Sequence, residues 1–136
     1  MKVVYLLTLV FLIVSCKEKA QTTLSAQEIV NKAISVSGGE QYSSNNIYYK
    51  FRDYEYASEW KDEKRILKRI RLTDSTKVVD VKASQGFKRF VNDSVVPLRD
   101  SIANLYANSV NSVHYFAHLP YGLNDPAVNK ELLGIV

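Results

Sequence analysis

Residues 47–98 decide the fold of this chain, and they read IYYKFRDYEYASEWKDEKRILKRIRLTDSTKVVDVKASQGFKRFVNDSVVPL. Apolar and polar side chains alternate along most of the stretch, which is typical of β-strands with one buried face. Polar segments at residues 73–75, 84–86 and 92–93 interrupt the alternation as turns do. Such short links join antiparallel neighbours, because a parallel crossover needs roughly a dozen residues. The stretch therefore predicts an antiparallel meander of about five strands.

The pattern inside the meander predicts which side chains face the core. The alternation changes phase near Asp53, which indicates one long first strand with a bulge or bend there. Residues 57–64 are interpreted as a polar turn around Trp60. In the next strand we expect the apolar face to be buried and the basic face to be solvated. The alternative is that Arg65, Lys68, Arg69 and Arg71 meet anionic membrane headgroups. The apolar face carries Ile66, Ile70 and Leu72, and the basic face carries Arg65, Arg69 and Arg71.

A helix is predicted before the meander. Ser25 and Glu28 have the spacing of a capping box, and Leu24 and Ile29 occupy the two positions of a hydrophobic staple. An apolar stripe follows at helical spacing, and glycines at 38 and 39 indicate where the helix ends. We expect this stripe to pack on the sheet, with a membrane surface as the alternative. The stripe consists of Ile29, Val30, Ala33 and Ile34.

A second amphipathic helix is predicted after the meander, and it gives the chain an α+β fold class. Asp100 is the expected N-cap, and the helix should end near Leu119 and Pro120. Asp125 and Pro126 then predict a short further turn of helix. The stripe expected to face the sheet is Ile102, Leu105, Tyr106, Ser109, Val110, Val113, Phe116 and Ala117.

The N-terminal residues read MKVVYLLTLVFLIVSC and predict a cellular address. Lys2 precedes an apolar run over residues 3–14, which is short of the roughly 20 residues that a membrane span needs. Residues 1–15 therefore have the pattern of a signal peptide. The small residue before a lone cysteine resembles the lipobox of bacterial lipoproteins, which implies that Cys16 is acylated after cleavage. Residues 16–23 would then tether the domain to a membrane; the alternative is a buried or unused thiol at Cys16.

Length and composition limit the remaining possibilities. The chain has 136 residues, 46% of them apolar and 24% charged, which suits one globular domain over residues 24–136. The formal charge is +4, and loss of a leader carrying Lys2 leaves 17 basic against 14 acidic residues, or +3. Acids interleave with these bases, so we expect no nucleic-acid partner. With one cysteine, no disulfide can form within the chain.

No catalytic or cofactor motif emerges. His114 and His118 are one helical turn apart, as metal ligands often are, but Tyr115 stands where a zinc protease of the His-Glu-x-x-His type has its glutamate. A half-exposed or loop-capping pair of histidines is the alternative, and we predict no metal site. The sequence contains no nucleophile elbow of the Gly-x-Ser-x-Gly type and no glycine-rich phosphate loop. An aromatic ligand patch is an alternative to ordinary strand positions for Tyr48, Tyr54 and Tyr56.

Residues 108–130 read NSVNSVHYFAHLPYGLNDPAVNK and carry a family resemblance, together with Glu28–Ile34 and the glycines at 38 and 39. This combination resembles an uncharacterised family of Bacteroidota lipoproteins whose architecture is related to the LolA/LolB lipoprotein carriers. The resemblance covers the mature chain and implies an incomplete β-barrel, with a curved sheet wrapped around helices and an apolar cavity on its concave side. Relatives continue into further strands, so we expect this domain to lack its last strands. The family carries over no catalytic residues.

Two functions follow as expectations, and neither is enzymatic. The first is a membrane-anchored lipoprotein of the cell envelope, on the periplasmic or surface face of the outer membrane, that binds a lipid or another hydrophobic ligand in the half-barrel. The second is a structural or protein-interaction lipoprotein without a ligand cavity. For the first, lipidation falls on Cys16, and the expected cavity floor is Ile47, Tyr49, Phe51, Ile66, Ile70 and Phe87.

Overall fold

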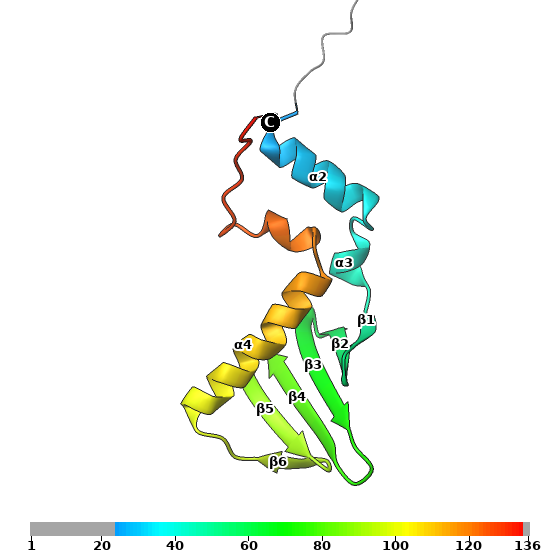
Figure 1. The fold of residues 1–136 in the computed structure, drawn as a ribbon, viewed down its shortest axis with the longest axis vertical. Helices are drawn as coiled ribbons and strands as arrows, with labels where there is room; N and C mark the ends of the chain where they lie inside the picture. The colour runs from blue at the N-terminus through cyan, green and yellow to red at the C-terminus, as the bar shows by residue number, and fades with distance from the viewer. Residues whose placement is uncertain (1–23, 135–136) are drawn as a thin grey trace, which may run out of the picture.

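The computed structural model describes residues 24–134 and confirms the α+β class (Figure 1). Its centre is one curved, open antiparallel sheet whose spatial order follows the chain from β1 to β6. The strands are β1 (Ile47–Phe51), β2 (Tyr54–Lys61), β3 (Lys64–Leu72), β4 (Lys77–Ala83), β5 (Gly86–Val91) and β6 (Ser94–Val96). The helices are α2 (Ala26–Val36), α3 (Gln41–Ser44), α4 (Asp100–Ala117) and the 3₁₀ turn η1 (Tyr121–Asn124).

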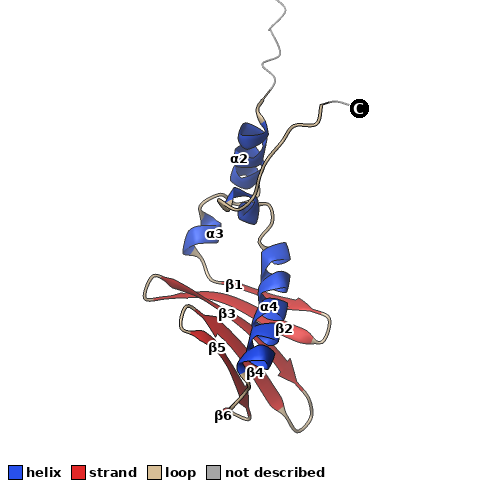
Figure 2. Cartoon of the chain, turned by 90° about the vertical axis from the view of Figure 1, so that its left-hand side faces the viewer, coloured by secondary structure: helices blue, strands red, loops and turns tan. Residues whose placement is uncertain are grey.

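Helix α4 covers one face of the sheet, crossing β3, β4 and β5 (Figures 1 and 2). Residues that pair directly across neighbouring strands point to the same face. One such row crosses all six strands beneath α4, and we call it the helix-side row: Tyr49, Tyr56, Arg69, Asp80, Arg89 and Val96. The residue next to each of these points the other way and forms the open-side row: Lys50, Glu55, Ile70, Val79, Phe90 and Val95.

The first half of the meander differs from the prediction. Residues 47–61 form two strands joined by a turn at Arg52 and Asp53, where we expected one bent strand. The expected polar turn at 57–64 is mostly strand, because β2 runs to Lys61 and the turn is confined to Asp62 and Glu63. Arg52, Asp62 and Glu63 have positive φ angles of 55°, 49° and 60°. Tight hairpins need such angles, and glycine or asparagine usually supplies them. Here arginine and glutamate, which seldom adopt positive φ, occupy these positions, so the sequence carries no glycine or asparagine that would indicate a turn.

Helix α2 begins as predicted but packs elsewhere. The capping box is present, with the Ser25 hydroxyl accepting from the Glu28 amide and the Glu28 carboxylate accepting from the Ser25 amide. Helix α2 contacts η1, and it lies beyond the edge of the sheet that strand β1 forms (Figure 1). Asn124 of η1 joins the two through its amide, accepting from Gln27 and donating to Asn31. Among residues 24–134, one helix therefore covers the sheet where two were expected.

Helix α4 presents a narrower face to the sheet than the sequence predicted. Its fully buried residues are Val110 and His114, at 0% and 1% exposure. Five members of the predicted stripe are exposed: Ile102, Leu105, Ser109, Phe116 and Ala117. Asp100 is the first residue of the helix and not its N-cap, which is Arg99. Asp125 follows η1 and accepts a hydrogen bond from the Ala127 amide, so the helix predicted after it is replaced by η1 before it.

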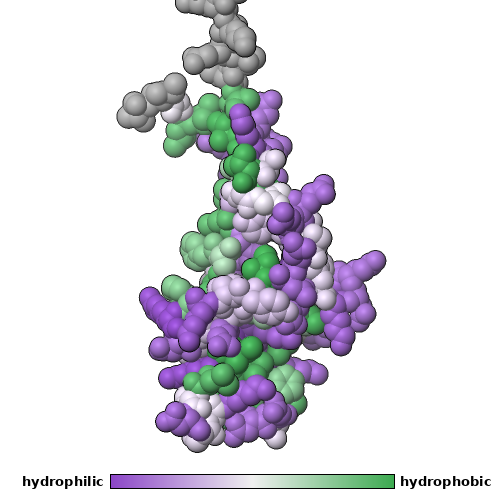
Figure 3. All heavy atoms as spheres, turned by 90° about the vertical axis from the view of Figure 1, so that its right-hand side faces the viewer, coloured by the Kyte–Doolittle hydropathy of each residue, from purple (hydrophilic) through white to green (hydrophobic). Residues whose placement is uncertain are grey.

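The opposite face of the sheet carries no helix of the described chain. Its open-side row contains four consecutive apolar residues on four adjacent strands, namely Ile70, Val79, Phe90 and Val95. Figure 3, which views the molecule from the side opposite to Figure 2, shows hydrophobic surface between hydrophilic margins on the sheet. Val95 is 60% exposed, so part of this apolar row is open to water.

The predicted signal peptide, the tether and Cys16 lie outside the described residues. Among residues 24–134, no helix is both long enough and apolar enough to cross a bilayer.

Candidate functional site

A buried ion-pair triad lies at the centre of the helix-side row. Asp80 of β4 is 2% exposed and accepts hydrogen bonds from two guanidinium groups. The Arg89 Nε lies 2.7 Å from its Oδ1, and the Arg69 Nη2 lies 2.7 Å from its Oδ2. The hydrogen bonds that Arg89 donates to the Asp80 carboxylate raise the pKa of Arg89. A further hydrogen bond, from Arg69 Nη1 to the Ser109 hydroxyl at 2.9 Å, connects the triad to α4. The basic face of β3, which we expected to be solvated, is therefore the face of the sheet that α4 covers.

Next to the triad, three rings form a neutral cluster. Tyr49 and Tyr56 stack with ring centroids 5.1 Å apart, and the His114 ring stands edge-on to both. The His114 Nε2 lies 3.0 Å from the Lys68 carbonyl oxygen, so this nitrogen carries the proton and donates. Its Nδ1 accepts from the Tyr49 hydroxyl at 3.1 Å. Burial lowers the pKa of His114 to about 4 and raises the pKa values of both tyrosines. The cluster is uncharged at neutral pH and packs as part of the core.

Beyond this cluster, a cavity of about 400 Å³ opens between β2, β3, α3 and the C-terminal end of α4. Its size is within the range of small-molecule sites. We call it the aromatic pocket, because its walls carry four aromatic rings besides the histidines: Tyr42, Trp60, Tyr115 and Tyr121. Tyr42 stacks on Tyr121 with centroids 5.4 Å apart. A Cβ at position 122 would lie 3.0 Å from the Tyr115 ring, so Gly122 is what allows that ring to pack close to η1.

Two buried polar atoms in the aromatic pocket have no hydrogen-bond partner in the described chain: the Ser58 hydroxyl and the His118 Nε2. Ser58 is 0% exposed. A buried polar atom without a partner costs about 1–3 kcal/mol, so such atoms are uncommon in folded domains. Both residues line the aromatic pocket, so the two atoms are buried within its walls.

Arg65 forms one side of the same pocket. Its guanidinium stacks on Trp60 at 4.2 Å from the ring centroid and donates to the carbonyl oxygens of Tyr42, Asn45 and Ser58. It forms no ion pair within residues 24–134. Burial lowers the pKa of Arg65. These contacts hold α3 and the β2–β3 hairpin together, so the pocket walls are fixed before any ligand binds.

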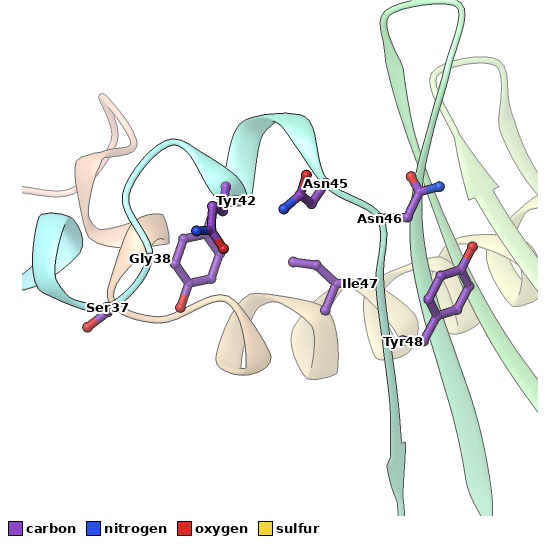
Figure 4. Close-up of a pocket in the computed structure, with 8 residues that line it drawn as sticks. Ser37, Gly38, Tyr42, Asn45, Asn46, Ile47 and Tyr48 are labelled. Atoms are coloured by element: carbon purple, nitrogen blue, oxygen red, sulfur yellow. The ribbon is translucent and has the colours of Figure 1, made fainter.

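A second hollow of similar volume lies on the other side of Tyr42, between α3 and the start of β1 (Figure 4). Figure 4 shows asparagines at 45 and 46 and the side chains of Ile47 and Tyr48 around it. Gly38 has φ of 130°, and a Cβ there would lie 3.1 Å from the Tyr42 ring. The hollow has no buried polar atom without a partner, so the aromatic pocket is the better candidate.

The structure does not bring the six predicted cavity residues together. Ile47, Tyr49, Phe51 and Phe87 are on the face that α4 covers, whereas Ile66 and Ile70 are on the open face. The reason is the pair of two-residue turns, because each turn pairs residues of opposite parity. Odd-numbered residues of β1 therefore share a face with even-numbered residues of β2 and odd-numbered residues of β3. None of the six lines the aromatic pocket.

The alternative sequence-derived sites are also separated. His114 has both ring nitrogens engaged in hydrogen bonds, and its ring centroid lies 6.0 Å from that of His118. Within residues 24–134, no three His, Cys, Asp or Glu side chains cluster as metal ligands would. Of the three tyrosines proposed as an aromatic patch, Tyr54 and Tyr56 are on the helix-covered face and Tyr48 is on the open one.

Sequence reasoning missed the residues that build the aromatic pocket. Trp60 and Ser58 fell in the segment interpreted as a turn, and Tyr42 fell in a segment without an assignment. The detectable signal was alternation, since Tyr54, Tyr56, Ser58 and Trp60 occupy every second position. His114 was missed as a core residue because its two partners, Tyr49 and the Lys68 carbonyl, are distant in sequence.

The fold and the site define an open-sheet α+β domain with one covering helix and a small-molecule-sized pocket at the end of that helix. The chain belongs to DUF6503, a family of unknown function, whose sequence model matches residues 2–132. This membership confirms that the domain is an uncharacterised one, while the Bacteroidota and lipoprotein assignments and the kinship with LolA/LolB stay predictions. No curated protein and no solved structure matches the chain.

Proposed function

We propose that this chain is an envelope lipoprotein, held to the outer membrane by acyl groups on Cys16, and that its domain binds a small amphipathic molecule in the aromatic pocket. One observation carries the ligand part of the proposal. Ser58 Oγ and His118 Nε2 are buried and without partners in a pocket walled by aromatic rings. A ligand with polar atoms at these two positions would remove the cost of leaving them unpaired.

The lining of the pocket indicates the chemistry of the ligand. Four aromatic rings offer apolar surface to a hydrocarbon or ring-shaped body. The polar atoms are few and lie at fixed places, which is how ligand sites obtain orientation. A molecule with an apolar body and one or two hydrogen-bonding groups fits this arrangement, and a medium-chain fatty acid is a simple probe of that class. No bond-making step is part of the proposal, and the proposed role is binding.

Trp60 is the only tryptophan of the chain and it lines the pocket, so its fluorescence reports binding without a label. The chain without residues 1–15 and with Cys16→Ser is titrated with dodecanoate, and with glucose as a hydrophilic comparison. We expect a saturable change in Trp60 emission with dodecanoate and none with glucose. Native mass spectrometry of the same protein should show a co-purified small molecule. If the Trp60 emission did not change during the dodecanoate titration, the proposed ligand binding would be refuted.

The variant Ser58→Ala separates binding from folding. Removing a buried hydroxyl without a partner should stabilise the apo protein by about 1 kcal/mol. The same change should weaken dodecanoate binding roughly fivefold to tenfold, because one hydrogen bond is lost. Stability is measured by urea unfolding and affinity by Trp60 emission. The matched control is Ser112→Ala, whose hydroxyl bonds only the Asn108 carbonyl on the exposed side of α4 and should leave affinity unchanged. Equal affinity in both variants would contradict the assignment of Ser58.

A second candidate function is that of an interaction lipoprotein without a ligand. The open-side row supports it, because Ile70, Val79, Phe90 and Val95 form a contiguous apolar row with no described element on top. Substituting Val95→Ser and Phe90→Ser would then abolish partner capture and leave the Trp60 titration unchanged. The ligand-binding function predicts instead that Ser58→Ala weakens the Trp60 titration and leaves partner capture unchanged.

The anchor is tested separately. Cys16→Ser should keep the protein from partitioning into membranes, and globomycin should cause the uncleaved form to accumulate. Two or more acyl chains hold a protein stably, whereas one holds it marginally. Unchanged size and partitioning under both treatments would refute the anchor and leave the pocket experiments valid.

A further inference from the structure

Another cavity lies under the N-terminal half of α4 and is distinct from the aromatic pocket and from the hollow beside α3. Its volume is about 340 Å³, and it lies between β3, β4, β5 and α4. We call it the arginine pocket, because three of its lining residues are Arg69, Arg71 and Arg89. Neither the tyrosine–histidine cluster nor the residues of the aromatic pocket line it.

The charges in the arginine pocket do not balance. Asp80 is its one acidic residue, and both of its oxygens are already taken by Arg69 and Arg89. Three guanidinium groups against one carboxylate leave two positive charges. The Arg71 guanidinium forms no hydrogen bond or ion pair within the described chain, and it lies 5.8 Å from the centroid of the Tyr54 ring. A partly enclosed site with this excess charge favours an anion.

Two of the guanidinium groups are held in place before an anion arrives. The Arg69 and Arg89 side chains are only 11% and 19% exposed, and buried Asp80 fixes both. The Arg89 guanidinium also lies over the Tyr106 ring, with its carbon 3.7 Å from the ring centroid. Guanidinium groups present several N–H donors in a rigid plane that matches phosphate oxygens. An anion would therefore meet donors that lose little side-chain entropy on binding.

We propose that the arginine pocket is a binding site for a phosphate group carried by a small molecule or a lipid headgroup. Arg71 is the one of the three guanidinium groups that no carboxylate engages, and it supplies the charge that closes on the anion. Arg69 and Arg89 supply further donors, and Asp80 positions them. Phosphate suits the site better than a carboxylate, because two net positive charges match a dianion and a carboxylate brings one negative charge.

The test is calorimetric titration of the full chain in maltoside detergent, at pH 7.5 and constant ionic strength. Glycerol 3-phosphate is the first probe and acetate the comparison. We expect saturable 1:1 binding of glycerol 3-phosphate and much weaker binding of acetate. Arg71→Gln should weaken glycerol 3-phosphate binding about tenfold, the loss of one charge-assisted contact of roughly 1.4 kcal/mol. Arg71 is exposed, so this variant should fold normally.

The control is Lys88→Gln, which removes one positive charge from the open face of the sheet. It should leave the affinity for glycerol 3-phosphate unchanged, because Lys88 does not line the arginine pocket and changes only the net charge. Equal weakening in the two variants, equal binding of acetate, or no saturable binding would each overturn the proposal. Dihexanoyl phosphatidic acid then identifies the source of the phosphate. Tighter binding than glycerol 3-phosphate indicates a lipid headgroup, and equal binding indicates a small phosphate ester.

Discussion

The helix-side and open-side rows occupy neighbouring positions on the same six strands, yet their environments are opposite. At the helix side, α4 covers Arg69, Asp80 and Arg89, and both arginines form ion pairs with Asp80. One residue away on each strand, the open side presents Ile70, Val79 and Phe90 with no described helix above them. The charged row is therefore inside, and the apolar row is the one left uncovered.

This contrast shows that residue type alone does not identify the buried face of a sheet. Burying a charge is unfavourable by itself, and Asp80 is tolerated because two guanidinium groups satisfy its oxygens. A row of paired charges and stacked tyrosines fixes the position of α4 by specific bonds, as at Ser109. An apolar row gives no such direction, but it remains available for other contacts.

The largest effect that separates the two rows should come from Asp80→Asn. The change keeps the shape of the side chain and removes the one negative charge with which the two enclosed guanidinium groups pair. We expect a loss of about 3–5 kcal/mol in the free energy of unfolding, measured by urea denaturation. The control is Asp93→Asn, because Asp93 pairs with Lys77 in a turn where its own side chain is 80% exposed. That variant should lose less than about 1 kcal/mol. Similar losses would mean that the triad is not buried as described.

The next effect depends on pH and originates in His114. Its pKa in the folded protein is lowered to about 4 by burial, against an ordinary value of 6.5. Between these values the unfolded chain binds a proton that the folded chain does not, so stability falls as the pH falls from 6.5 to 4. At about 1.4 kcal/mol per pH unit, the loss attributable to His114 is roughly 3 kcal/mol. Urea midpoints measured across this window should follow that slope.

The matched variant for the pH experiment is His114→Gln. Glutamine retains a donor for the Lys68 carbonyl and does not titrate between pH 4 and 6.5. The variant will be less stable at pH 7, since it loses ring packing against Tyr49 and Tyr56. Its stability should nevertheless change little between pH 6.5 and 5. A slope equal to that of the unmodified chain would assign the pH dependence to other groups.

The elements were predictable where the signal was local. The capping box at Ser25 and Glu28 is confirmed, and so are the helix over residues 100–117 and the antiparallel meander. The hairpin at Arg52 and Asp53 was not predicted, because its positive φ angle is carried by an arginine. Ile66 and Ile70 were placed in the predicted cavity because the apolar face of β3 was assumed to be the covered one, whereas its arginine face lies under α4.

The candidate sites were less predictable than the fold, because they depend on contacts between distant residues. Arg69 bonds to Asp80 on the neighbouring strand and to Ser109 on helix α4. No local sequence pattern predicts these contacts. The charge alternation in β3 was visible but was interpreted as a solvated face. Ser58 and His118 become conspicuous only when their burial and lack of partners are known.

The smallest expected effect tests how open the open-side row is. Val79→Thr replaces a methyl group with a hydroxyl of nearly the same volume. If Val79 is only partly buried, as described, water can reach the hydroxyl and the loss should be below about 0.5 kcal/mol. The same substitution at Val110, which is 0% exposed beneath α4, should cost about 1–3 kcal/mol. Both values come from urea unfolding of the full chain. A large loss at Val79 would show that this face is covered in solution, and it would favour the interaction function over a free surface.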